Sequence, residues 1–218
     1  MAFINYTSNS LTVKIVYYGP GLSGKTSNLR HIYDNIDPTA RGEFICVETG
    51  VERTCFFDLL PIKAGYIGVF RVNFQLMSAP GQVYYEASRK NILIGTDGLV
   101  FVADSQAPLL DANIQSLDGL RRNFQELRID LAKLPCVFQY NKRDLDNLVP
   151  VETLNSVLNP GKLPFVEAAA SAGRGVFETL REVARITVPL VRDKVFGMRS
   201  RQSAPPEDGG KKSDPDLI

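Results

Sequence analysis

Apolar residues follow two alternating patterns along the chain. Short, nearly continuous apolar runs are typical of strands buried in a parallel sheet, and they alternate with stretches whose apolar residues recur at helical intervals. The runs that we expect to be strands are 11–19, 43–48, 55–60, 69–77, 98–104, 135–144 and 164–170. The stretches that we expect to be helices are 25–36, 109–127, PVETLNSVL at 150–158, and 175–191. This alternation predicts an α/β fold with a mostly parallel central sheet and helices on both faces.

Two local features modify this picture. The turn residues in PIKAGYIG predict a hairpin around 61–68, which adds one antiparallel strand to the sheet. Pro189 falls late in the last expected helix and is expected to kink or end it.

The chain changes character from Arg199 onward. The sequence there is polar, contains Pro, Gly and Ser, and lacks apolar periodicity, which is typical of a disordered tail. We therefore predict one domain at 1–198 and a tail at 199–218; the alternative is a tail that docks on a partner.

Composition and charge narrow the class of protein. The chain has 218 residues, 44% of them hydrophobic and 22% charged, as in soluble globular domains. Its 25 basic and 24 acidic side chains nearly balance, so no electrostatic basis for binding nucleic acid is expected. The start, MAFINYTSNS, carries no targeting signal, and no apolar run approaches the ~20 residues of a membrane span. We expect a cytoplasmic protein without a direct membrane anchor.

The cysteine count also favours a cytosolic protein, and the histidine count limits the kinds of site that the chain can form. Three scattered cysteines without metal-ligand spacing are typical of reduced thiols in a cytosolic protein. A single histidine, His31, argues against a histidine metal site or a catalytic triad.

The segment GPGLSGKT (19–26) matches the phosphate-binding pattern G-x-x-x-x-G-K-[ST] between an expected strand and an expected helix. Glycines let successive backbone N–H groups surround an anion, and the helix adds its positive end. Lys25 is then expected to reach the β- and γ-phosphates, and the Thr26 hydroxyl to bind Mg²⁺. A chance glycine-rich turn is expected in on the order of one chain in a hundred, and less often in this context. The predicted phosphate-contacting residues are Gly19, Gly21, Ser23, Gly24, Lys25, Thr26 and Ser27.

The segment NKRD (141–144) closes an expected strand, at the edge where open α/β sheets bind ligands. The Asp144 carboxylate can accept hydrogen bonds from N1–H and the exocyclic amine of guanine, whereas adenine would leave it unpaired, a difference worth about 10⁴ in selectivity. Asn141 is expected to tie this loop to the base or to the phosphate loop, with the Lys142 stem along the ring. Alone the tetrapeptide is usually a solvated turn, but after a placed phosphate loop it predicts guanine-nucleotide binding.

These motifs resemble those of a known protein family. The chain resembles Ras-type small GTPases, and YYGPGLSGKT, ERTCFFDLLP, PGQVYYEASRK and NKRD resemble the MglA family of bacterial polarity GTPases, over roughly residues 11 to 195. The resemblance implies a P-loop small GTPase fold, GTP/GDP and Mg²⁺ as ligands, and a cytoplasmic role in cell polarity or motility. It implies polarity or motility effectors and a roadblock-type GTPase-activating partner resembling MglB. It also places EAAASAGRGV (167–176) at the last guanine loop, with the Ala170 N–H directed at the base oxygen, although Ala169 replaces the usual serine.

The tripeptide Pro80-Gly81-Gln82 resembles a nucleotide-sensing loop. Gln82 is the candidate for orienting the attacking water, and its alternative is an exposed loop glutamine. Gly81 is expected to contact the nucleotide. Ser78 stands where such loops usually carry an aspartate that holds a Mg²⁺-bound water, and we expect its hydroxyl to take over that task with weaker coupling to the metal.

The first switch is expected around 49–54. Thr54 is the candidate ligand of Mg²⁺ and γ-phosphate, and Thr49 is the alternative, because spacing does not separate them. Arg53 is either a surface arginine paired with Glu52 or Glu86, or an arginine finger supplied in cis, which is worth about 10³ or more in rate. The MglA resemblance implies the finger.

The resulting hypothesis is a GTP-binding and GTP-hydrolysing switch whose segments around 45–60 and 78–90 are ordered by GTP and read by a partner. Aromatic residues near these segments are candidates for that contact surface or for the core: Phe56, Phe57, Tyr84 and Tyr85. Two alternatives remain. Ser78 and the loose last guanine loop are the features expected of a nucleotide-binding scaffold with little or no hydrolysis, but Gln82 and Arg53 argue against it. An ATP-dependent kinase is disfavoured by NKRD.

Overall fold

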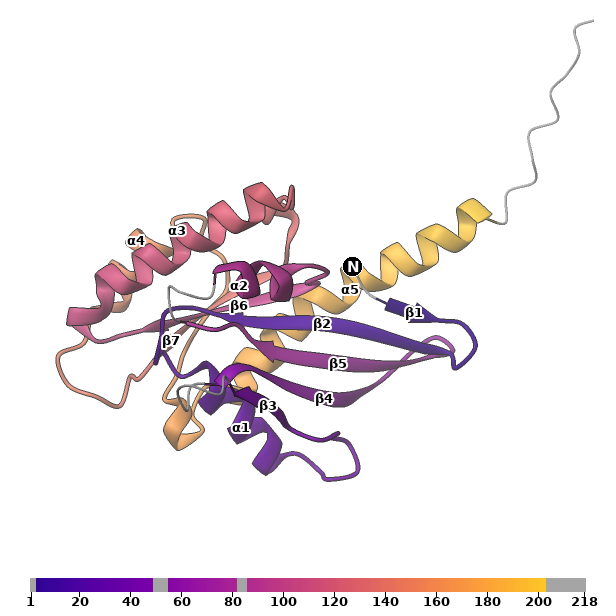
Figure 1. Cartoon of the computed structure of the whole chain (residues 1–218), viewed down its shortest axis with the longest axis horizontal. Helices are drawn as coiled ribbons and strands as arrows, with labels where there is room; N and C mark the ends of the chain where they lie inside the picture. The colour runs from indigo at the N-terminus through magenta and orange to yellow at the C-terminus, as the bar shows by residue number, and fades with distance from the viewer. Residues whose placement is uncertain (1–2, 49–54, 82–85, 203–218) are drawn as a thin grey trace, which may run out of the picture.

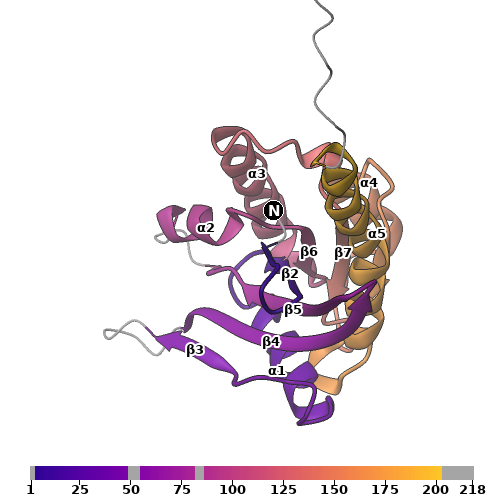
Figure 2. The same cartoon turned by 90° about the vertical axis from the view of Figure 1, so that its right-hand side faces the viewer.

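The computed structural model describes residues 3–48, 55–81 and 86–202. An eight-stranded sheet forms the centre of the fold, and helices pack on both of its faces (Figures 1 and 2). The strands are β1 Phe3–Asn5, β2 Ser10–Tyr18, β3 Ile45–Glu48, β4 Cys55–Ile67, β5 Phe70–Ser78, β6 Gly98–Asp104, β7 Cys136–Asn141 and β8 Phe165–Glu167. The α-helices are α1 Lys25–Asn35, α2 Glu86–Leu93, α3 Leu110–Glu126, α4 Val151–Leu158 and α5 Val176–Gln202. Short 3₁₀ turns are η2 Ala107–Leu109, η3 Leu131–Lys133 and η4 Ala170–Ala172.

The sheet has the order β3-β4-β5-β2-β6-β7-β8. Strand β2 pairs in parallel with β5 and β6, and β6–β7 and β7–β8 are also parallel, which confirms the mostly parallel sheet. The expected antiparallel hairpin strand is β4, which runs against β5. A second, short antiparallel strand, β1, pairs with β2 and was not predicted, because three residues are too few to show alternation.

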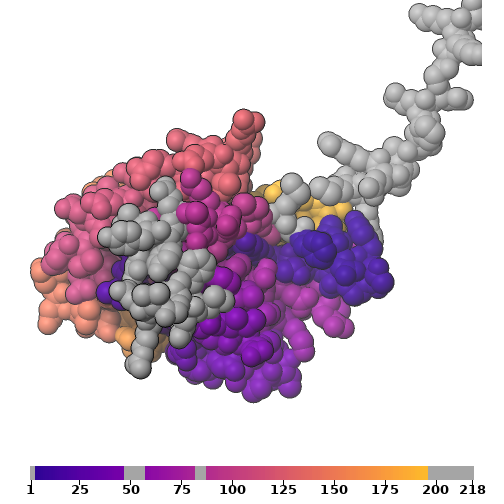
Figure 3. All heavy atoms as spheres, viewed as in Figure 1, coloured from indigo at the N-terminus to yellow at the C-terminus, as the bar shows by residue number. Residues whose placement is uncertain are grey.

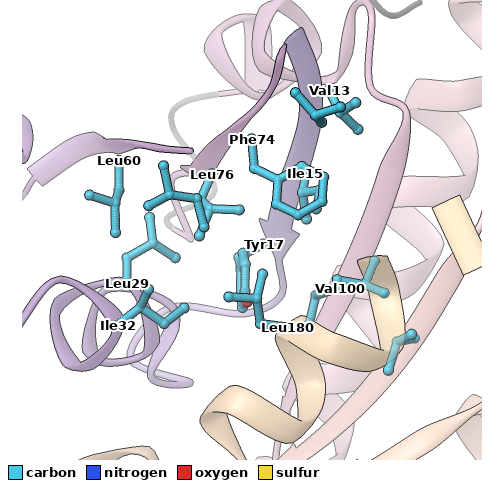
Figure 4. Packing of buried hydrophobic residues seen from close by; sticks show 14 of the residues in the cluster. Val13, Ile15, Tyr17, Leu29, Ile32, Leu60, Phe74, Leu76, Val100 and Leu180 are labelled. Atoms are coloured by element: carbon cyan, nitrogen blue, oxygen red, sulfur yellow. The ribbon is translucent and has the colours of Figure 1, made fainter. Parts of the chain in front are cut away.

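Two apolar layers hold the sheet between its helices. One layer joins α1 and α5 to the sheet face that carries Val13, Ile15 and Tyr17 (Figure 4). The other joins α2, α3 and α4 to the opposite face. Alternate residues of β6 point into the two layers, Val100 into the first and Phe101 into the second, so all seven residues of this strand are buried. A strand buried on both faces explains its continuous apolar run.

Several elements differ from the prediction, most clearly β4, α2 and α5. Strand β4 continues through 61–67, so the hairpin turns at Gly68 and Val69 and not across the whole of 61–68. Helix α2 was not predicted, because its large apolar residues, Ile92 and Leu93, stand together at its end and do not recur at helical intervals. Helix α5 passes through Pro189 and continues to Gln202, since buried Val191 and Val195 keep packing its later turns against the sheet layer.

The first part of the predicted tail is therefore helical, up to Gln202. The remaining residues, 203–218, lie outside the described part of the chain, and their disorder stays a prediction.

At one end of the molecule, the turn after β1 and the β4–β5 hairpin lie side by side (Figure 3), with the rings of Tyr6 and Phe70 in edge-to-face contact. Among the described residues, no helix is both long and apolar enough to cross a membrane. Cys136 is a buried free thiol, as expected, whereas Cys46 is disulfide-bonded, so the expectation of reduced thiols is wrong for Cys46.

Candidate nucleotide-binding site

The phosphate-binding pattern lies in the expected context, with β2 ending at Tyr18 and α1 beginning at Lys25. Gly19 has a φ of +148°, and a Cβ there would lie 2.2 Å from the Val102 carbonyl oxygen. Gly24 has a φ of +98° at the N-cap of α1, and a Cβ there would lie 2.1 Å from the Asn141 Nδ2. Both positions therefore require glycine, for conformation and for space.

Lys25 is buried in the curl of this loop. Its Nζ donates hydrogen bonds to the carbonyl oxygens of Gly19 at 3.0 Å and Pro20 at 2.5 Å. Burial lowers the pKa of the Lys25 ammonium to about 7, Asp58 opposes this shift, and Arg89 adds to it. An anion in the loop would favour the charged form of Lys25, so this geometry suits a phosphate group.

A cavity of about 260 Å³ opens beside this lysine. Its walls include Thr26 and Ser27 from α1 and Ser78 and Gly81 from the segment after β5. The structure thus brings the predicted phosphate loop against the start of the predicted nucleotide-sensing loop.

A second cavity, of about 230 Å³, is lined by the predicted base-binding residues Asn141, Lys142, Asp144 and Ala170. The two cavities share Leu22, Gly24 and Ser27 in their walls, so they are neighbouring parts of one cleft. This cleft lies at the carboxyl ends of β2 and β7, where open α/β sheets bind ligands.

Asn141 ties the base loop to the phosphate loop, one of the two roles expected for it. Its buried side chain donates from Nδ2 to the Ser23 carbonyl oxygen at 2.7 Å and accepts from the Ala170 N–H at Oδ1, at 2.9 Å. Because the Ala170 N–H is already donated to Asn141, its contact with a base oxygen stays a prediction. The Ser23 hydroxyl is buried and has no hydrogen-bond partner among the described residues.

Lys142 has a φ of +65°, and its Nζ lies 2.7 Å from the Asp104 Oδ2. Asp104 ends β6 and is 1% exposed, and its backbone is fixed by two hydrogen bonds with the Asn113 side chain on α3. The ion pair anchors the Lys142 ammonium while its side chain lines the second cavity, and the placement of its stem along a base stays a prediction. Asp104 itself was missed, although an acid at the end of a wholly apolar strand was an available signal.

Asp144 is exposed at the mouth of the cleft. The Ser171 hydroxyl donates to its Oδ2 at 3.3 Å, so the carboxylate is oriented by the loop that carries Ala170. This position leaves the carboxylate able to meet the edge of a base.

Ser78 faces a buried carboxylate that sequence reasoning missed. Its Oγ donates to the Asp58 Oδ2 at 2.7 Å and accepts from the Asp58 N–H at 3.0 Å, because β4 and β5 place the two residues side by side. Asp58 is 0% exposed, and its Oδ1 has no hydrogen-bond partner within the described residues. The negative charge that Ser78 lacks is therefore supplied from the neighbouring strand.

The donor set fits a magnesium ion. Mg²⁺ prefers oxygen ligands and is usually held by few protein groups together with substrate phosphates. Thr26 and Ser78, which both carry hydroxyls, line the same cavity, and Asp58 is hydrogen-bonded to Ser78. Within the described part of the chain, no three His, Cys, Asp or Glu side chains gather into a metal cluster.

Gly81 lies against the phosphate loop. A Cβ on Gly81 would lie 2.5 Å from the Gly21 Cα and 2.6 Å from the Gly21 backbone nitrogen. A Cβ on Gly21 would lie no closer than 3.8 Å to Gly81. The two loops thus touch backbone to backbone at this point.

The remaining candidate residues lie outside the described part of the chain, so their roles stay predictions: Thr49, Arg53, Thr54, Gln82, Tyr84 and Tyr85. Phe57 packs against the apolar layer beneath α2, α3 and α4, which favours its core interpretation.

Comparison with known proteins adds the family. No protein-family model matches the chain. The chain is 50% identical over 188 residues to the mutual gliding-motility protein MglA of Myxococcus xanthus (strain DK1622), a match that covers 86% of this chain and 96% of that protein. Identity at this level over nearly the whole relative agrees with the α/β fold, the phosphate loop and the base loop described above. The chain belongs to the MglA family of Ras-like small GTPases.

Proposed function

We propose that this protein is a GTP-binding and GTP-hydrolysing molecular switch that controls cell polarity or motility through GTP-dependent partner binding. The observation that carries the proposal is the cleft with Lys25 at one end and Asn141 and Asp144 at the other. A guanine nucleotide has the two ends that these residues recognise, a polyphosphate and a base edge with two donors.

Hydrolysis of GTP depends mainly on positioning and on charge stabilisation. In the proposed mechanism, the loop amides and protonated Lys25 hold the phosphates, and Gln82 orients the attacking water. Arg53 supplies positive charge to the transition state. Bound Mg²⁺, held by Thr26, by Thr54 and through the Ser78–Asp58 pair, would neutralise negative charge on the phosphates.

The Ser78–Asp58 pair supports a working magnesium site. A Mg²⁺-bound water needs a hydrogen-bond acceptor, and the Ser78 hydroxyl with the Asp58 carboxylate behind it provides one. We expect Asp58→Asn to weaken Mg²⁺ binding to the GDP complex more than Ser78→Ala does, because it removes the charge. Equal Mg²⁺ affinity in wild type and both variants would contradict this role.

The biological role rests on the relative, whose name describes a protein of gliding motility. By extension we propose a cytoplasmic role in polarity or motility. The proposed partners are motility effectors and a roadblock-type GTPase-activating protein resembling MglB. Nucleic acid and a direct membrane anchor are not part of the proposal.

The first experiment follows GTP hydrolysis by the purified protein with Mg²⁺, beside its Gln82→Leu variant. Turnover that the variant loses supports the switch. Tight GTP binding without turnover, alone and with an activating partner, would instead indicate a nucleotide-gated scaffold. Preferential retention of ATP would contradict the guanine site.

Arg53→Ala provides the second test. We expect turnover to fall by about 10³ while GTP affinity is kept, because a finger acts on the transition state. Loss of affinity equal to the loss of turnover would assign Arg53 to ground-state binding.

A further inference from the structure

Three polar side chains meet beneath the cleft, inside the apolar layer between the sheet and the helices α1 and α5. They are Asn28 on α1, Gln139 on β7 and Thr179 on α5, and each is fully buried. None of them belongs to the phosphate pattern or to the base loop. Three polar groups at such depth need an explanation, because burial of an unpaired amide or hydroxyl is destabilising.

Their hydrogen bonds form a closed network. The amides of Asn28 and Gln139 pair reciprocally, Nδ2 to Oε1 at 2.8 Å and Nε2 to Oδ1 at 2.8 Å. The Gln139 Nε2 also donates to the Thr179 Oγ1 at 2.8 Å. Every amide N–H direction therefore has an acceptor once the backbone contacts are included, so the network is satisfied.

The backbone contacts attach the network to both nucleotide-binding loops. The Asn28 Nδ2 donates to the carbonyl oxygen of Gly24 at 2.9 Å, at the end of the phosphate loop. The Thr179 hydroxyl donates to the carbonyl oxygen of Gly175 at 2.6 Å, in the segment that carries Ala170. Gln139 lies two residues before Asn141, on the strand that ends in the base loop.

This placement gives the network a task that an apolar core would not perform. Apolar side chains of equal volume would fill the same space and would pack without directional preference, often at little cost in stability. Directed hydrogen bonds instead fix the position of α1 relative to β7 and α5. Asn141 repeats the connection at the surface of the cleft, through its bonds with Ser23 and Ala170.

We propose that Gln139, with Asn28 and Thr179, is a positioning residue that sets the separation between the phosphate loop and the base loop. A ligand that binds both ends gains from their fixed separation, because the second contact forms without a further loss of freedom. A ligand that binds one end gains nothing. The proposal rests on guanine-nucleotide binding but not on hydrolysis.

The test removes the network and keeps the volume, with the triple variant Asn28→Leu, Gln139→Leu, Thr179→Val. Thr187→Val is the matched control: Thr187 is equally buried on α5, and its hydroxyl has no hydrogen-bond partner among the described residues. Binding of GDP to nucleotide-free protein is compared with binding of two one-end probes, guanosine and inorganic pyrophosphate. Thermal unfolding of each variant is recorded in parallel.

We expect the triple variant to bind GDP at least about tenfold more weakly, with both one-end probes changed by less than about twofold. Thr187→Val should match wild type for all three ligands. Equal weakening of all three ligands would show local distortion of a loop and overturn the proposal. Unchanged GDP binding would overturn it too, because the network would then act only as core.

A second variant covers the case in which the triple variant does not fold. Thr179→Val alone keeps the Asn28–Gln139 pair and releases only the tie to α5, and we expect an intermediate loss of GDP affinity with guanosine and pyrophosphate unchanged. An unchanged GDP affinity in Thr179→Val would contradict the proposal. Failure of wild type to bind GDP would refute guanine-nucleotide binding itself, which separates the two ideas.

Discussion

Lys25 makes nucleotide binding dependent on pH in a way that can be worked out from the structure. Burial lowers the pKa of its ammonium to about 7 in the nucleotide-free protein. Bound phosphates favour the charged form, so nucleotide binding above pH 7 draws one proton from solution. The observed affinity then falls as 1/(1 + 10^(pH − 7)), which is a loss on the order of tenfold between pH 7 and pH 8.5. The stability of the nucleotide-free protein depends on pH in the opposite direction. Unfolding restores the ordinary, higher pKa of Lys25, so the unfolded chain takes up a proton. The free energy of unfolding therefore increases as the pH rises from 7.

Titration of nucleotide-free protein with GDP checks this, in buffers that differ in ionisation enthalpy. At pH 8 the heat should report uptake of about 0.9 proton per GDP bound. The titrations begin at pH 7, because the terminal phosphate of the nucleotide itself titrates near pH 6. Lys25→Met is the control and should bind weakly, with a flat pH profile. Asp58→Asn should move the fall in affinity to lower pH, since Asp58 opposes the lowering of the Lys25 pKa. A constant wild-type affinity from pH 7 to 8.5 without proton uptake would refute the reasoning.

Four further substitutions test other parts of the molecule. Asp144→Asn should weaken GTP binding by at least about 10²-fold and favour xanthosine triphosphate, whose position-2 carbonyl accepts from an amide; equal loss of both nucleotides in competition binding would contradict the assignment. Gly24→Ala should lower nucleotide affinity and thermal stability together, because the new Cβ displaces the Asn141 amide, and unchanged GDP release would argue against this. Phe101→Ala should lower the free energy of unfolding in urea by about 3–5 kcal/mol, and a cost under about 1 kcal/mol would show that the layer collapses around the gap. Pro189→Ala should raise the thermal midpoint, since it restores a helical hydrogen bond, and a fall would mean that the proline ring itself stabilises α5.

Features encoded by neighbouring residues were predictable from the sequence. The bounds of β6 agree with the apolar run 98–104, since a strand buried on both faces leaves no polar position to blur its limits. The phosphate and base loops were equally accessible, because their chemistry resides in contiguous residues. The β4–β5 hairpin was foreseen but its turn was placed too early, since β4 continues beyond an irregularity between Lys63 and Tyr66 that includes Gly65.

Features set by contacts between distant segments were not predictable. Asp58 became part of the site only through its pairing opposite Ser78 on β5, and no local pattern records that register. Asp104 reached Lys142 because β6 and β7 are neighbours in the sheet. Gln139 read as one polar residue in a buried strand, and its partners lie on two helices remote in sequence.

Gly21 and Gly81 differ in the space that each has for a side chain, and this difference determines which variants the fold can tolerate. A methyl group on Gly21 finds ordinary van der Waals distance, whereas one on Gly81 strikes backbone atoms that have no side chain to move aside. Alanine at position 21 is therefore admissible in this conformation, and alanine at position 81 must push the segment after β5 away from the phosphate loop. The contact between the two loops therefore depends on glycine at position 81. A single methyl group there would separate the loops, although the glycines that shape the phosphate loop would be unchanged.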